Sequence, residues 1–251
     1  MNLNITNNQK EKLSGVLHKA NAKKSVVIVC HGHTGNKDRP FPTGICKALR
    51  KAGINSFRFD FSGNGESEGR FEDSTFSKEA QDLRSVVDHF CREGYDEIGI
   101  IGHSMGAVAC VVEAANDKRL KFVIWVAGPV HLESSFKDLL ASKQTRKIKN
   151  NGRTEIQFFK ESSKKWLTVS KKFFADLKKV KPLAEVKKIK VPILFIHGTE
   201  DEAVPVKECE MIFAEANPPK ELIVIHGANH CFDDKKHHRE LEKEIAGWIK
   251  K

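Results

Sequence analysis

The pentapeptide Gly-His-Ser-Met-Gly at positions 102–106 fits the pattern G-x-S-x-G, which can present a serine as a nucleophile. A strand-like run, Glu97 to Ile101, precedes it, and a helix-like run, Met105 to Ala115, follows it. In this setting the serine lies on a tight turn between strand and helix, where bulky neighbours would clash, so glycines flank it. The turn lifts the hydroxyl of Ser104 out of the sheet. The pattern therefore predicts that Ser104 is a nucleophile.

Two residues further along the chain can complete a catalytic site around Ser104. A serine hydroxyl is a poor nucleophile unless a base takes its proton, and His230 is the candidate base. Asp201 is the candidate acid, which would hold His230 in one tautomer and stabilise the imidazolium. All three residues follow predicted strands, at the carboxyl ends where parallel α/β sheets place their sites. The order Ser, Asp, His along the chain also suits such a sheet.

Neighbouring residues offer alternatives for the acid and the base. Glu200 and Glu202 compete with Asp201 for the acid role. His226 falls at the end of a predicted strand, and positions 237–238 fall in a charged run, so we favour His230 over these histidines. Other residues receive structural interpretations: His103 is expected to pack against the serine turn, His197 to be a structural histidine, and Gly63-Asn64-Gly65 to be a turn beside the site, because no Lys-Ser/Thr follows it.

The segment that follows the strand-like run Val26 to Cys30 can stabilise a negative charge. It reads His31-Gly32-His33-Thr34, and a turn of this kind can aim a backbone N–H at a developing oxyanion. The N–H of Met105, at the start of the predicted helix, can supply a second donor. We expect an oxyanion hole made by the N–H groups of His33 and Met105. The side chain of His33 is left open between the acyl pocket and a surface loop.

Strand-like and helix-like runs alternate along most of the chain, which predicts a parallel α/β sheet with helices on both faces. An antiparallel pair over residues 3–6 and 12–18 precedes them. The predicted strands are Ser25 to Cys30, Ile54 to Phe59, Glu97 to Ile101, Phe122 to Val126, Val191 to Ile196 and Glu221 to Ile225. The predicted helices are Phe76 to Cys91, Met105 to Ala115, Lys207 to Ala216 and Arg239 to Lys250.

Residues 129–190 break this alternation and are rich in lysine, so we interpret them as a cap inserted into a core of residues 1–128 and 191–251. Apolar residues recur at helical spacing in the cap, which predicts an amphipathic helix; they are Trp166, Val169, Phe173, Leu177 and Val180. The favoured interpretation is a lid in which Trp166 and Phe173 bind substrate. A membrane-surface helix and a nucleic-acid patch are the alternatives. Lysine outnumbers arginine in this segment, which argues against recognition of nucleic acid.

Taken together, these motifs resemble the α/β-hydrolase superfamily, and in particular the small esterases of the serine-aminopeptidase-like (hydrolase 4) group, which includes cinnamoyl and feruloyl esterases. The resemblance is carried by His31 to Lys37, Phe59 to Ser67, Gly102 to Gly106, Gly198 to Pro205 and Gly227 to His230. It implies an eight-stranded, mostly parallel sheet with an inserted cap. It also implies a Ser104–His230–Asp201 triad and hydrolysis of carboxylic esters through an acyl-enzyme.

The predicted function is therefore a serine esterase that acts on small-molecule esters of small or medium acyl groups. No metal or organic cofactor is expected. A thioesterase, a monoacylglycerol lipase or a peptidase on the same triad stays open, because a fold does not determine a substrate. A non-catalytic protein that binds a ligand is the alternative from another class. A homodimer is one candidate for the assembly state, which the sequence leaves open.

Composition narrows the class of protein and locates its charge. The chain has 251 residues, 43 Lys and Arg against 33 Asp and Glu, and six cysteines without a C-x-x-C pair. A spanning helix needs about 20 apolar residues, and no run approaches that length. With a polar N-terminus and scattered cysteines, we expect a soluble, cytoplasmic protein. Residues 129–190 hold 17 Lys and Arg against 6 Asp and Glu, so the cap carries the whole excess charge. This charge raises the hypothesis that the substrate is anionic.

Overall fold

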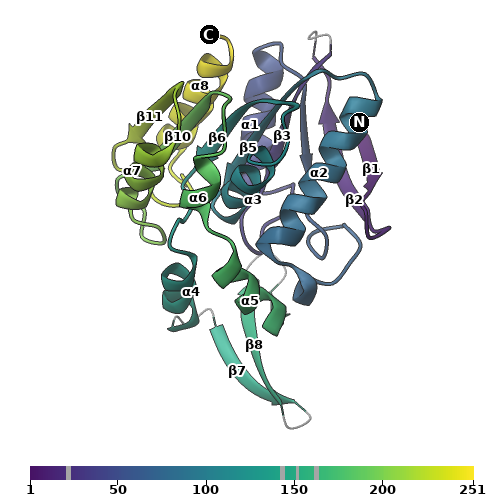
Figure 1. Cartoon of the computed structure of the whole chain (residues 1–251), viewed down its shortest axis with the longest axis vertical. Helices are drawn as coiled ribbons and strands as arrows, with labels where there is room; N and C mark the ends of the chain where they lie inside the picture. Colours follow the sequence, from purple (N-terminus) through teal and green to yellow (C-terminus); the bar gives the residue numbers. More distant parts are fainter. Residues whose placement is uncertain (21–23, 142–144, 151–152, 161–163) are drawn as a thin grey trace.

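The computed structural model describes residues 1–20, 24–141, 145–150, 153–160 and 164–251 and is built around one eight-stranded sheet (Figure 1). The strand order is β1-β2-β4-β3-β5-β6-β10-β11. The strand β2 pairs antiparallel with both of its neighbours, and the other neighbouring pairs are parallel. The predicted α/β class and mostly parallel sheet are therefore confirmed. The strands are β1 (Asn2–Thr6), β2 (Lys12–His18), β3 (Ser25–Cys30), β4 (Ser56–Phe59), β5 (Glu97–His103), β6 (Leu120–Val126), β10 (Ile193–Gly198) and β11 (Lys220–Ile225).

Helices cover both faces of the sheet because the central strands are apolar on both sides. In β3, Val26 and Ile28 face one layer of core, Val27 and Val29 face the other, and none of them is more than 2% exposed. Helices α2, α3 and α7 pack on the first face, and α1 and α8 pack on the second. These helices are α1 (Pro40–Lys51), α2 (Phe76–Arg92), α3 (Met105–Ala114), α7 (Val206–Glu215) and α8 (Lys235–Ile249).

Local signals explain where these helices begin. The side chain of Thr75 caps α2 by accepting the N–H of Lys78 at 3.1 Å, and Asp234 caps α8 by accepting the N–H of Lys236 at 2.7 Å. The sequence patterns did not predict α1, whose first residue is Pro40. A proline suits the first position of a helix, since its missing N–H would have no partner within the helix. Among the described residues, no helix combines the length and the apolar character needed to cross a membrane.

The chain leaves the large sheet after β6 and returns at β10, which pairs directly with β6. Between them lies the segment 129–190, which we call the cap segment; of its residues, 142–144, 151–152 and 161–163 lie outside the described residues. Figure 1 shows this segment projecting from one end of the large sheet. Its elements are α4 (Leu132–Ala141), a small antiparallel sheet of β7 (Thr145–Asn150), β8 (Arg153–Lys160) and β9 (Lys165–Val169), and then α5 (Lys171–Lys179) and α6 (Pro182–Val186).

The predicted cap helix is wrong in its first part. Trp166 and Val169 lie on the strand β9, and only the later members of the apolar stripe lie on or just after the helix α5. Pairing with β8 keeps this stretch extended, and Ser170 ends it with extended backbone angles (φ −82°, ψ 165°). A spacing of three or four residues is helical only if the whole stretch is a helix, and the neighbouring strand is not visible in that spacing.

The cap segment is attached to the core at the N-terminus of α2. There the carboxylate of Asp176, on α5, accepts the backbone N–H of Ser77 at 2.9 Å and its hydroxyl at 2.6 Å. The first N–H groups of a helix lack partners within the helix and attract negative charge. A cap carboxylate therefore satisfies a donor of the core, which fixes α5 against α2.

Candidate active site

Ser104 lies on a strained turn between β5 and α3. Its backbone has φ +54° and ψ −123°, a conformation that side-chain-bearing residues rarely adopt, and its N–H donates to the carbonyl of Val126 at 2.9 Å. The flanking glycines are required by space. A Cβ atom on Gly102 would lie 2.2 Å from the carbonyl oxygen of Gly106, and one on Gly106 would lie 2.4 Å from that of His31. The turn can therefore form only where positions 102 and 106 lack a side chain.

The structure brings Ser104, His230 and Asp201 together from three separate loops. Nε2 of His230 lies 3.1 Å from Oγ of Ser104, and Nδ1 lies 2.8 Å from Oδ2 of Asp201. A carboxylate can only accept, so Nδ1 carries the proton. Nε2 then has a free lone pair facing the serine hydroxyl. This arrangement allows His230 to take a proton from Ser104.

Asp201 is buried but well supplied with donors. Its side chain is 1% exposed, and Oδ1 accepts the N–H groups of Ala203 and Val204 at 2.9 and 2.8 Å. Burial alone would raise the pKa of Asp201, but hydrogen bonds from His197 and His230 outweigh it and hold that pKa well below its usual range. Asp201 is therefore a carboxylate wherever the protein is folded near neutral pH, which lets it stabilise a protonated His230.

His197 and His103 support this arrangement from either side. Nε2 of the fully buried His197 lies 3.0 Å from Oδ2 of Asp201 and 2.8 Å from the carbonyl of Val204, so it carries a proton and donates. Nε2 of His103 donates to the backbone carbonyl of His230 at 2.8 Å. Burial, together with the nearby His230, lowers the pKa of His103 to about 3, so this side chain is neutral. It positions the loop that carries His230 without adding charge.

Hydrogen bonds from backbone N–H groups join the loops after β10 and β11, which carry Asp201 and His230. The N–H of Glu200 donates to the carbonyl of Ala228 at 3.0 Å, and the N–H of Gly227 donates to the hydroxyl of Thr199 at 2.9 Å. Because β10 and β11 pair in parallel, both loops leave the same edge of the sheet. These bonds hold the two loops side by side, which brings Asp201 and His230 together although they are far apart in the sequence.

The two predicted oxyanion donors lie on segments that adjoin the serine, since Met105 follows Ser104 directly and a Cβ atom on Gly32 would lie 3.1 Å from the Cβ of Ser104. Met105 is the first residue of α3, so its N–H has no acceptor within the helix. The carbonyl of Gly32 accepts Nδ1–H of His31 at 2.8 Å and the N–H of Gly35 at 3.0 Å. The N–H of His33 belongs to the same trans peptide, so it points the opposite way from this carbonyl.

The side chain of His33 is surrounded by phenylalanines rather than placed on a surface loop. Four phenylalanine rings have centroids 5.1–5.8 Å from its imidazole: Phe71, Phe136, Phe158 and Phe173. Three of them belong to the cap segment and one, Phe71, to a short 3-10 helix of the core. The open question about this histidine is thereby answered in part: it joins the loop of residues 31–39, which we call the oxyanion loop, to the cap segment.

A cavity of about 660 Å³ opens beside Ser104 and His230. Its walls come from the oxyanion loop, the start of α1, the loops of Asp201 and His230, and the start of the cap segment. The lining includes His31, His33, Arg39, Phe41, Met105, Pro129, Phe136, Glu202, Val204 and Asp233. A volume of this size suits a small-molecule ligand.

The two cap residues predicted to bind substrate do not line this cavity. Phe173 is 1% exposed and packs behind Phe136, with ring centroids 4.8 Å apart. Trp166 lies on β9 against Phe159, with the guanidinium of Arg146 4.3 Å from its ring centroid. The cap residues that do line the cavity come from the beginning of the segment, and Phe136 takes the position we expected for Phe173. The mistaken helix explains the error, because it placed both residues on one face.

The other candidate acids and bases lie apart from the serine contact. Glu202 lines the cavity, but its carboxylate meets only the backbone N–H of His230, at 3.4 Å. His238 lies 3.4 Å from Glu242 on α8, and His226 is exposed. Within the described part of the chain, no group of three or more His, Cys, Asp or Glu side chains could hold a metal ion.

Several residues of the site were not found by sequence reasoning. Arg39 precedes α1 and Phe41 lies in its first turn, and both line the cavity. The prolines at positions 40 and 42 were the available signal for this helix. Phe136 lies on α4, where only a single phenylalanine marks the position. These residues contact the cavity because of how their elements pack, which no local pattern records.

Solved structures with the same architecture define the class. Est1E from Butyrivibrio proteoclasticus, solved with ferulic acid bound, aligns with a TM-score of 0.82 at 22% identity, over 98% of this chain and 97% of that one. Alpha/beta hydrolase domain-containing protein 10 from mouse aligns with a TM-score of 0.79 at 16% identity, over 100% and 98%. Esterase Pf2001 from Pyrococcus furiosus aligns with a TM-score of 0.77 at 24% identity, over 100% and 91%. These likenesses establish the fold, which is that of the α/β-hydrolases.

A match to a family model identifies the family to which the chain belongs within this fold class. The model described as "Serine aminopeptidase, S33" matches residues 21–181, more than half of the chain. The chain belongs to this family, which confirms the resemblance carried by the motifs. Among curated proteins, it is similar to the uncharacterized proteins YfhR of Salmonella typhi (24% identical, 82% of this chain and 64% of that protein) and YqkD of Bacillus subtilis (26% identical, 90% and 71%). It therefore spans somewhat less than two thirds of the length of YfhR.

Proposed function

We propose that the protein is a serine esterase that hydrolyses carboxylic esters of small or medium acyl groups through an acyl-enzyme. One observation carries the proposal: Ser104, His230 and Asp201 lie in a hydrogen-bonded row at the wall of a cavity of about 660 Å³. The fold and the family support a hydrolase. We keep the cytoplasm as the expected compartment, since all six cysteines are free.

The geometry supports acyl transfer to water. Nε2 of His230 takes the proton of Ser104 as Oγ attacks the ester carbonyl, and the N–H groups of His33 and Met105 receive the charge on the carbonyl oxygen. His230 then gives its proton to the leaving alcohol, and the acyl group stays on Ser104. A water molecule, deprotonated by His230, attacks the acyl-enzyme and releases the acid. Asp201 remains ionised throughout and stabilises the imidazolium.

Covalent labelling tests whether Ser104 is an activated nucleophile. A fluorophosphonate should phosphonylate Ser104 alone, because an ordinary serine hydroxyl does not react with it. The label is located by peptide mass spectrometry. Ser135 provides a matched control, since it also lines the cavity, and its hydroxyl donates to the carbonyl of His131 at 3.1 Å. Labelling should persist in Ser135→Ala and vanish in Ser104→Ala. An unlabelled wild-type protein would favour the non-catalytic, ligand-binding alternative.

A peptidase that accepts a free amino terminus is the second candidate, and two carboxylates favour it. Glu202 and Asp233 both line the cavity, where they could bind an ammonium group, and Arg39 is the cationic side chain on the same wall. The lysine-rich cap segment acts in the other direction, because its charge would attract anionic substrates. Thioesterase and monoacylglycerol lipase activities use the same triad and differ only in the leaving group.

Substrates of different charge distinguish these possibilities. We expect kcat/KM for a monoester of a dicarboxylic acid to fall threefold or more, as a rough magnitude, between about 0.05 M and 0.5 M salt, since exposed charges are screened over this range. The value for a neutral ester of the same length should stay constant. Equal salt dependence would contradict attraction by the cap. A preference for amino-acyl anilides over both esters would favour the peptidase.

A further inference from the structure

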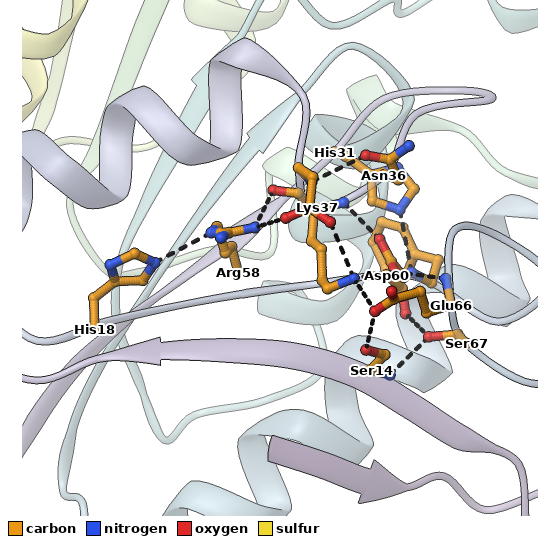
Figure 2. A network of polar contacts seen from close by, with 11 residues as sticks. Ser14, His18, His31, Asn36, Lys37, Arg58, Asp60, Glu66 and Ser67 are labelled. Atoms are coloured by element: carbon orange, nitrogen blue, oxygen red, sulfur yellow. Dashed lines mark hydrogen bonds and ion pairs between the residues drawn. The ribbon is translucent and has the colours of Figure 1, made fainter. Parts of the chain in front are cut away.

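A cluster of charged side chains surrounds Lys37, near the end of the oxyanion loop, residues 31–39 (Figure 2). At its centre, Nζ of Lys37 lies 3.1 Å from Oδ2 of Asp60 and 2.7 Å from Oε2 of Glu66. The backbone N–H of Lys37 also donates to Oδ1 of Asp60, at 2.5 Å. One carboxylate therefore holds both the side chain and the main chain of Lys37.

The centre of this cluster, Lys37 with Asp60, is buried. The side chain of Asp60 is 0% exposed and that of Lys37 is 5% exposed. Burial by itself would lower the pKa of Lys37, but its hydrogen bonds to Glu66 and Asp60 outweigh it and raise that pKa above its ordinary value. Lys37 thus stays charged. A buried ion pair often stabilises a fold no better than apolar residues of the same volume, so stability alone is a weak reason for it.

The cluster ties the oxyanion loop to the rigid sheet. Glu66 also accepts the hydroxyl of Ser14 on β2 at 3.2 Å, and the guanidinium of Arg58 on β4 donates to the carbonyl of Lys37 at 2.8 Å. Figure 2 shows Lys37 with Arg58 on one side and Asp60 and Glu66 on the other. Motion of the loop at Lys37 would therefore have to break several charged contacts.

The turn that follows β4 is shaped around Asp60. Gly65 has φ +53°, and a Cβ atom there would lie 2.1 Å from Oδ2 of Asp60. The N–H of Glu66 donates to the same oxygen at 2.9 Å. The Gly-Asn-Gly sequence at 63–65, expected to be a turn beside the site, thus wraps the carboxylate that holds the oxyanion loop.

The same turn contacts the oxyanion loop at a second point. The N–H of Phe61, next to Asp60, donates to Nε2 of His31 at 3.2 Å. His31 and Lys37 therefore fix both ends of a short segment, and the Gly32–His33 peptide lies between them. Because this peptide is rigid, fixing its ends and the Gly32 carbonyl also fixes the direction of the His33 N–H.

We propose that Lys37 is a positioning residue for ester hydrolysis: with Asp60 and Glu66 it holds the oxyanion loop so that the His33 N–H faces the oxyanion. This inference rests on the proposed function. An N–H donor contributes to catalysis only when it is already aimed at the place where charge develops. A displacement of about 1 Å can reduce a rate about 100-fold. Lys37 acts through the backbone and does not touch the substrate.

The test replaces Lys37 by methionine and separates transition-state from ground-state effects. Lys37→Met should lower kcat about 10- to 100-fold and change KM less than about threefold, because the oxyanion forms only during reaction. A trifluoromethyl ketone is the second probe: Oγ of Ser104 adds to its carbonyl carbon, the proton passes to His230, and the carbonyl oxygen becomes an oxyanion. Its inhibition constant should rise by the same factor as kcat falls. Lys37→Arg keeps the charge and should restore most of the activity.

Glu68→Gln is the matched control, because Glu68 lies two residues after Glu66 on the segment that follows β4 and accepts the backbone N–H of Lys12 at 2.8 Å without contacting Lys37. It should retain wild-type kcat. Since Lys37→Met leaves Asp60 buried without its cation, the double variant Lys37→Met/Asp60→Asn removes both charges and keeps the fold testable. If both fail to fold, Glu66→Gln at the exposed end decides, with a loss of about threefold expected.

Two failures are distinguishable. If the wild type hydrolyses esters and a folded Lys37→Met or double variant keeps its kcat and its affinity for the ketone, the positioning role is overturned. An equal loss in Glu68→Gln would overturn it as well. If the wild type neither hydrolyses esters nor is labelled at Ser104, the proposed function itself fails.

Discussion

Replacing Ser104 by alanine should lower kcat for ester hydrolysis by about 10⁴-fold or more, because the nucleophile is lost while the oxyanion donors remain. The hydroxyl of Ser104 contacts Nε2 of His230, so its removal takes no hydrogen bond from the hydrophobic core. Alanine meets the same left-handed backbone as serine at this position, so the strain of the turn is unchanged. We therefore expect the midpoint of thermal unfolding to move by less than about 2 °C, within the range of a neutral substitution.

Stopped assays on a neutral ester at saturating concentration measure this effect, with circular dichroism as the check on folding. Ser135→Ala is the control within the same cavity and should keep its kcat within about twofold, as expected of a residue outside the reaction. Turnover by Ser104→Ala at a tenth of the wild-type rate, as a rough limit, would rule out the proposed nucleophile.

The second large effect is expected at Asp201. Replacing it by asparagine should lower kcat about 10³- to 10⁴-fold near neutral pH. An amide can present its NH₂ group to Nδ1 of His230, which would move the ring proton to Nε2 and remove the lone pair that faces Ser104. The amide would also be neutral, so the imidazolium formed during reaction would lose its counter-ion. The hydrogen bond from Nε2 of His197 to the carbonyl of Val204, at 2.8 Å, does not involve the side chain of Asp201, so it keeps the loop in place and limits the structural change.

A pH profile shows which group controls activity in acid. The pKa of Asp201 is held well below its usual range, so Asp201 remains ionised across the weakly acidic range. The loss of wild-type kcat/KM on acidification should therefore occur without protonation of Asp201. In Asp201→Asn, kcat/KM should be low at neutral pH. Glu202→Gln is the control, since it removes the adjacent carboxylate, which meets only the backbone of His230. An equal loss in both variants would contradict the assignment.

Much of the fold could be predicted because the signals are local. In the core, apolar strand-length runs alternate with amphipathic stretches, and central strands such as β3 and β10 are buried on both faces, so their residue pattern alone identifies them. The turn at Ser104 is also encoded by its local sequence, since only glycines at 102 and 106 leave space for it. The helix α1 was missed because two prolines at its start do not by themselves indicate a helix. The strand β9 was predicted as helix because its apolar residues are spaced by three or four, and the neighbouring strand that keeps it extended cannot be seen in that spacing.

The candidate site was likewise predictable where the signals are local and unpredictable elsewhere. The sequence by itself determined the nucleophile's turn and the loops in which an acid and a base would lie, since backbone geometry and chain order limit those choices. Only the tertiary structure decided between Asp201 and its neighbouring glutamates, replaced Phe173 by Phe136 at the cavity, and joined Lys37 to Asp60. Each of these depends on contacts between loops far apart in the sequence. Such contacts are set by how parallel strands order themselves in the sheet and by which side chains fill the space between their loops, and neither is recorded in any single stretch of residues.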